Sequence, residues 1–519
     1  MQPVLRTSQK RSRLGLVHWW TEIGKIALKR YCLVLAAFLI LVGREAALTQ
    51  STPAFPLKAS ADQRYLVDQS GMPFPIVGRA LWELVSISTS DRNTILADTV
   101  NRAYTAVEMR APSRIPSSPR APFDGDGNLP FLKRLDGAPY TGTLSYGNVN
   151  NEAPDFTTPN EAYWSRLDSL FNDCLSRNLL VMYFPAYNGY QGGSEGWMPE
   201  MVANGTSRMQ TYGAWAANRY KNQRNLVWLI AGDYGTVSQP YNSNQRAVEE
   251  AFVTGLQSIS GQSSILISAE GADGSVSTDL PNTLAAAISL NGSYSFQGLS
   301  AYHGRRAYAR SPAVPSFQIE EPYDEEGPDG TGKNPAATQP TRRFQWWGWL
   351  TTIGGVMHGN GYVIHFSPNW QNHLATQTTQ DMTRMAGFMR SIPWHRLVPS
   401  GLGGARTLIT AGGSTSDAAD YVAAAVTPDG AWLIAYIPPS HSGSITVDMS
   451  ALGGLARARW FDPTSGTYSD VGTMLPNSGG RSFTPPGNNS AGARDWVLVL
   501  STGSETAPPA APTNLRIVR

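Results

Sequence analysis

Eight short apolar runs, separated by stretches with helical periodicity, recur between residues 60 and about 366 of this 519-residue chain. Strands that alternate with helical patterns indicate repeated βα units and a parallel sheet. Eight units close a (β/α)8 barrel, so the sequence predicts an α/β fold of the TIM-barrel type. The eight runs cover residues 75–82, 106–110, 179–187, 226–233, 265–270, 296–302, 316–320 and 361–366.

The helical pattern is clearest over residues 160–178, where apolar side chains recur at spacings of three and four and form one face. The run Thr158-Pro-Asn-Glu161 supplies start signals for this helix. We interpret Cys174, on the apolar face, as a core residue rather than a nucleophile, because buried thiols are usually inert.

From about residue 405 the pattern changes to short alternating strands with turn signals between them. Runs at 421–426, 432–437, 444–448, 456–460 and 495–500 predict a small all-β sandwich after the barrel. We therefore expect an N-terminal leader at 1–50, a barrel domain at 60–400 and a β-sandwich at 405–501. A Pro-rich linker and the start of a further module follow at 502–519.

The leader has the order of charge, apolar run and small residues that is typical of a secretory signal. Its apolar run, residues 31–43, is shorter than the ~20 residues of a membrane-spanning helix. We expect cleavage and secretion to the extracellular or periplasmic space, with an uncleaved membrane anchor as the alternative. Cys32 lies in this run, so the mature chain keeps Cys174 alone and forms no internal disulfide.

Charge argues against a nucleic-acid partner. The first 30 residues hold seven of the Lys and Arg residues and one Glu, so the rest of the chain carries a net charge of about −4. A nucleic-acid groove requires a basic surplus on the folded part. The histidines show no metal-ligand spacing, and the glycine pairs lack the flanks of a phosphate loop, so no metal and no cofactor are predicted.

Carboxylates stand at the ends of two predicted strands, where this barrel builds its sites. Asp233 closes the fourth run, and Glu320 and Glu321 close the seventh. Glycoside hydrolysis needs two such groups across a cleft, one to protonate the leaving oxygen and one to attack the sugar or activate water. Glu270, at the end of the fifth run, is a third candidate. The structural alternative is that each acid pairs with a nearby arginine, with Arg79, Arg110 and Arg305 as candidates.

Aromatic residues gather near the predicted strand ends, and their ring faces can stack on the C–H faces of sugars. Any one of them could instead pack in the core or at the rim. The candidate substrate-binding residues, with one arginine added, are Trp82, Arg110, Tyr187, Tyr234, Tyr302 and Tyr323. We interpret the Pro- and Gly-rich stretch 111–157 as a rim of the substrate cleft.

Several motifs resemble the apiosidase-like (DUF4038) glycoside hydrolase family. They are Arg64 to Gly78, Thr158 to Tyr163, Pro185-Ala-Tyr-Asn-Gly-Tyr190, Tyr212-Gly213 and Asn225 to Asp233. The segment from Ala456 to Leu500, with Trp460-Phe-Asp-Pro-Thr-Ser-Gly466, resembles the β domain that commonly follows, which is labelled a putative collagen-binding domain. The resemblance covers about 60–501, and we expect the β domain to be a rigid appendage of the barrel.

This resemblance implies a (β/α)8 barrel with Asp233 as general acid/base and a Glu after the seventh strand as nucleophile. The family pattern Ile-Glu-x-x-Tyr-Glu selects Glu320, with Tyr323 as its partner, whereas alignment on Pro322 selects Glu321. The chain departs from the family in having Arg79 in place of an acid and Glu270 in place of a His. The arginine would change what the sugar pocket recognises, so apiose is not assumed.

The sequence therefore predicts a secreted, retaining glycoside hydrolase that acts on a polysaccharide or its side chains. The alternative is a catalytically inactive carbohydrate-binding or surface-adhesion protein on a barrel scaffold. The expected partner is a polysaccharide or glycoside, with no nucleic acid, and with membrane contact only through an uncleaved N-terminal segment.

Overall fold

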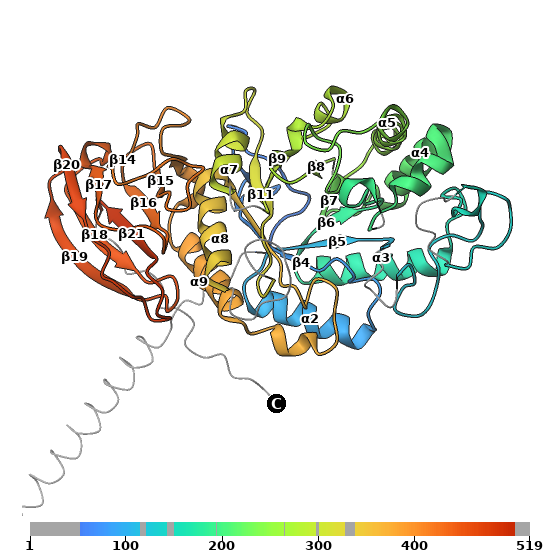
Figure 1. The fold of residues 1–519 in the computed structure, drawn as a ribbon, viewed down its shortest axis with the longest axis horizontal. Coiled ribbons are helices and arrows are strands. Elements are labelled where there is room, and N and C mark those ends of the chain that lie inside the picture. The colour runs from blue at the N-terminus through green and yellow to red at the C-terminus, as the bar shows by residue number, and fades with distance from the viewer. Residues whose placement is uncertain are drawn as a thin grey trace, which may run out of the picture. The chain divides into compact units, whose positions relative to one another are not determined.

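A computed structural model describes residues 52–114, 121–142, 150–193, 195–263, 265–296, 300–326 and 338–503, which fall in one unit, Thr52–Glu505. The predicted leader at 1–50 and residues 504–519 lie outside the described residues. Within the described ranges, no helix is both long and apolar enough to cross a bilayer. Figure 1 shows the helices and strands of the barrel and the strands of the C-terminal domain.

A nine-stranded sheet forms the barrel wall, in the order β8-β7-β6-β5-β4-β12-β11-β10-β9. Neighbouring strands pair in parallel, except that β9 is antiparallel to β10. The strands are β4 (Ile76–Ala80), β5 (Ala106–Arg110), β6 (Leu180–Phe184), β7 (Leu226–Ala231), β8 (Ile267–Glu270), β9 (Ser275–Val276), β10 (Asn291–Tyr294), β11 (Ser316–Glu320) and β12 (Ile353–His358). The fold class predicted from the sequence is confirmed.

Two of the eight predicted strands were placed wrongly. The sixth is β10, which ends at Tyr294, whereas the predicted run 296–302 extends into helix α7 (Ser300–Ala309). The eighth is β12, whereas the predicted run 361–366 is a turn that follows it. Both true strands contain glycine, and a Cβ at Gly355 would lie 1.9 Å from the carbonyl oxygen of Ile76. Close backbone contact at glycine therefore helps to hold β12 in the sheet, so this strand lacks the apolar pattern by which the other strands were recognised.

The gap between β8 and β10 is bridged by a side chain rather than by a backbone ladder. The Ser277 hydroxyl donates to the Ala269 carbonyl oxygen at 2.5 Å and accepts from the Gly292 N–H at 2.7 Å. Ser277 thus connects the two ends of the parallel sheet, which brings the end of β8 near the end of β10.

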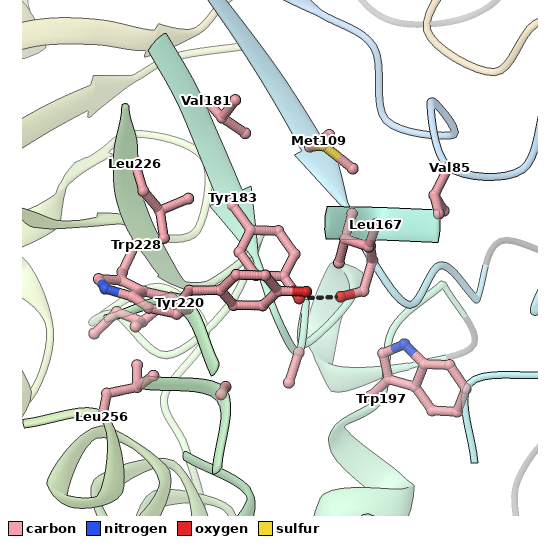
Figure 2. Close-up of a cluster of buried hydrophobic side chains, with 14 of the residues drawn as sticks. Val85, Met109, Leu167, Val181, Tyr183, Trp197, Tyr220, Leu226, Trp228 and Leu256 are labelled. Carbon is pink, nitrogen blue, oxygen red and sulfur yellow. Dashed lines mark hydrogen bonds between the residues drawn. The ribbon is translucent and has the colours of Figure 1, made fainter. Parts of the chain in front are cut away.

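Helices cover the outside of the sheet (Figure 1). They are α2 (Thr89–Asn101), α3 (Glu161–Ser176), α4 (Met198–Tyr220), α5 (Ser243–Gln257), α6 (Asn282–Ala285), α7, α8 (Thr338–Thr352) and α9 (Gln377–Ser391). The predicted helix at 160–178 is α3: Asn160 caps it by accepting from the Ala162 N–H, and Cys174 is buried in its core face. Figure 2 shows part of this core, where Tyr183 packs near Tyr220 and Trp228 and donates to the Ala111 carbonyl oxygen.

The C-terminal domain contains two antiparallel sheets, as the alternating pattern predicts. The six-stranded sheet has β13 (Val398–Pro399), β15 (Ala423–Val426), β16 (Trp432–Ile437), β21 (Trp496–Ser501), β18 (Ala456–Phe461) and β19 (Tyr468–Leu475), in that order. The three-stranded sheet has β14 (Ile409–Ala411), β17 (Ile445–Asp448) and β20 (Gly480–Phe483). A third small sheet, β1 (Lys58–Ala59), β2 (Leu66–Val67) and β3 (Pro73–Phe74), precedes the barrel.

The six-stranded sheet packs on α8 and α9 through one continuous apolar core. The Trp346 ring stacks on Tyr436 with a centroid distance of 5.8 Å. The buried Arg342 guanidinium pairs with Asp381 and with Asp495, each at 2.7 Å. The six-stranded sheet and the two barrel helices therefore share one core.

Candidate active site

Asp233 follows β7 on a backbone that no regular strand would adopt. Ala231, Gly232 and Asp233 all have positive φ values, of 63°, 109° and 55°. Glu249 of α5 fixes this bend by accepting from the Ala231 N–H at 3.0 Å, and the Tyr187 hydroxyl donates to Asp233 Oδ2 at 2.5 Å. Strained backbone of this kind concentrates at functional sites. The bend thus fixes a buried carboxylate at the carboxyl end of the barrel.

A β-bulge in β11 decides which of its two terminal glutamates faces the barrel interior. Ser293 pairs with Gln318, but the next residue of β10, Tyr294, pairs with Glu320, so Ile319 is the extra residue. Such a bulge re-aims the side chains beyond it. Glu320 joins the interior carboxyl groups, whereas Glu321 Oε2 accepts from Gln318 Nε2 at 2.8 Å and faces α8.

Three carboxyl groups meet at the carboxyl ends of β7, β8 and β11. One oxygen from each of Asp233, Glu270 and Glu320 lies within 4.8 Å of the other two. Burial raises the pKa of Asp233, while the Tyr187 hydrogen bond and the charge of Arg110 act against that rise. Burial and the Asp233 charge raise the pKa of Glu270 to about 8, and burial and Glu270 raise the pKa of Glu320 well above its usual range. At neutral pH this cluster therefore retains protons.

Arg110, the last residue of β5, supplies the cation of the site. Its guanidinium lies 3.5 Å from the ring centroids of both Trp82 and Tyr187, so the two rings enclose it. It is buried, and none of its three nitrogens has a hydrogen-bond partner among the described residues. The charge attracts Asp233 and Glu270. An enclosed cation with free N–H groups is suited to bind an oxygen-rich ligand.

Aromatic side chains continue from Arg110 to form one wall. Trp82 packs edge-on against Tyr323 at 5.4 Å, and Tyr323 packs on Phe296 at 5.7 Å. Tyr234 turns toward α5, where its hydroxyl donates to Gln245 Oε1 at 3.1 Å. Tyr302 is not brought to the carboxyl groups: it lies on α7, 43% exposed, and its ring packs on His303.

The three arginines proposed as structural partners of the acids lie in different parts of the fold. Arg110 is near the carboxyl cluster, but Arg305 donates to the Ser400 carbonyl oxygen and the Tyr421 hydroxyl, at the β domain. Arg79 points outward and pairs with Asp98 of α2 at 2.7 Å. The expectation that Arg79 changes the sugar pocket is therefore wrong, because its side chain lies on the other face of β4.

Two buried residues at the site were missed from the sequence. Glu108 lies two positions before Arg110 on the same face of β5, and its charge acts on both Glu270 and Glu320. Tyr294, at the end of β10, lies close to Asp233 and Glu320. The alternation of polar residues in Ala106-Val-Glu-Met-Arg110 was a usable signal for Glu108. Tyr294 was missed because its strand was placed wrongly.

The same carboxyl cluster is the one group within the described ranges whose Asp, Glu, His or Cys side chains lie close enough to hold a metal ion. Arg110 already supplies positive charge beside it. The raised pKa values of these groups favour bound protons, which compete with a cation for the same oxygens.

The profile of the apiosidase-like catalytic domain matches residues 60–396, which is more than half of the chain. The chain belongs to the apiosidase-like family. It is a glycoside hydrolase, and its carboxyl cluster lies at the barrel end where this architecture builds active sites. The profile named "Putative collagen-binding domain of a collagenase" matches residues 405–501.

Solved structures share the fold of this apiosidase-like protein at low sequence identity. A glycoside hydrolase family 5 protein from Bacteroides vulgatus is 18% identical with a TM-score of 0.67, over 87% of this chain and 94% of that one. Another, described as a glycoside hydrolase, is 18% identical with a TM-score of 0.68, over 87% and 98%. No curated protein matches this chain significantly.

Proposed function

We propose that this glycoside hydrolase works by retention, with Asp233 as general acid/base and Glu320 as nucleophile. One observation carries the proposal: one carboxylate oxygen of each residue lies within 4.8 Å of an oxygen of the other, at the ends of β7 and β11. Retaining enzymes hold their two carboxyl groups ~5–5.5 Å apart, whereas inverting enzymes need room for a water molecule between them. The short separation therefore favours direct attack by Glu320.

In the first step Glu320 forms a bond to the anomeric carbon while the bond to the leaving oxygen breaks and Asp233 gives that oxygen its proton. In the second step Asp233 takes a proton from water, the water oxygen attacks the anomeric carbon, and the ester to Glu320 breaks. Asp233 must be protonated and Glu320 ionised at the start, so this mechanism requires that the protons retained by the cluster reside on Asp233 and Glu270. The free N–H groups of Arg110 and the oxygens of Glu270 would bind sugar hydroxyls.

We also propose a polysaccharide or its side chains as substrate and secretion as the route to it. The basic and apolar leader supports secretion, and the aromatic wall of Trp82, Tyr323 and Phe296 supports a sugar ligand. N-terminal sequencing of the protein recovered from culture medium tests the first point. A start beyond residue 43 is expected, and retention in the membrane fraction would support the anchor instead.

The activity test is a panel of aryl glycosides and of pectic and arabinan polysaccharides. Release of the aryl group from at least one glycoside is expected, with the anomeric configuration of the first product retained in proton NMR spectra. An inverted first product would exclude Glu320 as nucleophile. Tight binding of a glycan with no reducing ends released over long incubation would instead favour a catalytically inactive carbohydrate-binding protein.

A further inference from the structure

The loop after β6, which carries Tyr187, also presents an exposed aromatic side chain. Tyr190 begins a short 3-10 turn, Tyr190–Gly192, and is 53% exposed. It lies three residues after Tyr187, which hydrogen-bonds Asp233. Three residues span at most ~10 Å, so the Tyr190 backbone lies within ~10 Å of the Tyr187 backbone, which is about the length of two sugar rings.

Backbone contacts fix the two ends of this loop. The Asn188 N–H donates to the Ala231 carbonyl oxygen at 2.9 Å, and the Trp197 N–H donates to the Tyr187 carbonyl oxygen at 2.7 Å. A Cβ on Gly196 would lie 2.1 Å from the backbone of Asn188 and Gly189, so the two ends of the loop are in close contact. The exposed Tyr190 therefore lies on a loop whose two ends are fixed by backbone contacts.

The turn also lies on the Asp233 side of the site. A Cβ on Gly192 would be 2.8 Å from the ring of Tyr234, the residue that follows Asp233. The next loop, after β7, carries Val237, which is 90% exposed. The loops after the neighbouring strands β6 and β7 thus each expose one such side chain at the end of the barrel that carries Asp233.

We infer that the Tyr190 ring is the stacking surface for the leaving-group sugar, so that the substrate is an oligosaccharide or polysaccharide chain extending past Asp233. This inference rests on the proposed function, in which Asp233 gives its proton to that sugar's oxygen. An exposed ring on the same loop as Tyr187, the partner of Asp233, offers the flat apolar face that a sugar ring covers.

The kinetic test compares two substrates of the same sugar, one with a sugar leaving group and one with fluoride, which has nothing to stack. Tyr190→Ala should lower kcat/KM for the oligosaccharide by ~5–10-fold and leave the glycosyl fluoride unchanged. Tyr190→Trp should restore the oligosaccharide rate. Leu455→Ala, which removes an equally exposed apolar side chain in the β domain, should change neither rate. An equal loss on both substrates would overturn the inference.

Affinity electrophoresis through gels that contain the polysaccharides of the panel gives a readout without catalysis. Wild type and Leu455→Ala should be retarded by at least one polysaccharide, and Tyr190→Ala should lose that retardation. Equal retardation of Tyr190→Ala, or retardation of wild type by none of them, would overturn the inference. A wild type that is retarded but cleaves neither glycoside nor fluoride would refute the proposed function while leaving this surface supported.

Discussion

Tyr187 donates its hydroxyl hydrogen to Asp233 across 2.5 Å while its ring covers one face of the Arg110 guanidinium. The hydrogen bond favours the ionised carboxylate and so holds down a pKa that burial raises. In Tyr187→Phe the pKa of Asp233 should rise further. Because Asp233 must be protonated to act, the basic limb of the kcat/KM profile should move to higher pH.

The pH profiles of wild type and Tyr187→Phe measure this shift directly, and movement of the basic limb to higher pH is expected. Movement of the basic limb to lower pH would contradict the assignment of Asp233 as the acid. Thermal unfolding of the variant serves as the control that its fold survives.

Glu270 should make the protein's stability depend on pH. Its pKa is about 8 in the folded protein, above the ~4.3 of an exposed Glu, so between these values the unfolded state ionises first. Folded-state stability is therefore lost as pH rises through this window. Glu270→Gln should be as stable as wild type at pH 4 and more stable at pH 8, by roughly 4 kcal/mol. Urea unfolding at both pH values tests this, and a gain that is equal at both would contradict it.

Gly232 leaves room for Tyr187. A Cβ there would lie 2.1 Å from the Tyr187 ring, and φ is +109°. Gly232→Ala should displace the ring from Asp233 and lower turnover by at least ~10-fold, with a stability loss of ~1–3 kcal/mol. Gly71→Ala is the matched control, because φ there is +85° and nothing lies within 4 Å. Similar turnover in the two variants would show that the contact with Tyr187 is unimportant.

Arg342 joins the barrel to the β domain through two buried carboxylates. Arg342→Met should leave Asp381 and Asp495 without their cation and lower the free energy of unfolding by ~3–5 kcal/mol. Arg457→Met, which breaks an exposed pair with Asp470, should lower it by ~1 kcal/mol or less. Urea unfolding of both variants measures the difference, and an equally small effect of Arg342→Met would argue against a rigid junction.

The sequence predicted those parts of the fold that carry an apolar pattern. Six barrel strands and the five β-domain runs were predicted close to their observed bounds, because each has alternating or continuous apolar residues. The strand β10, Asn291–Tyr294, is short and polar, and β12 gains its place from glycines that permit close backbone contact. Neither a short polar strand nor a close backbone contact at glycine produces a hydrophobic periodicity in the sequence.

The candidate site was predictable in part. Strand-end position selected Asp233 and the Glu320-Glu321 pair from the sequence. The choice within that pair depends on the bulge at Ile319, which arises from the pairing of β11 with a strand whose position was wrong. The outward direction of Arg79 likewise depends on where its strand begins. Side-chain direction at a strand end is thus set by register, which tertiary pairing decides.

The most direct test of the account is turnover of the aryl glycoside by Glu320→Gln beside Glu321→Gln. Both variants replace one buried carboxyl group at the end of β11 with an amide of the same size, so they share the effect of changing a buried carboxyl group. We predict that Glu320→Gln, like Asp233→Asn, loses at least ~10²-fold in kcat while Glu321→Gln stays near the wild-type rate. Full activity of Glu320→Gln in a folded protein would contradict the account.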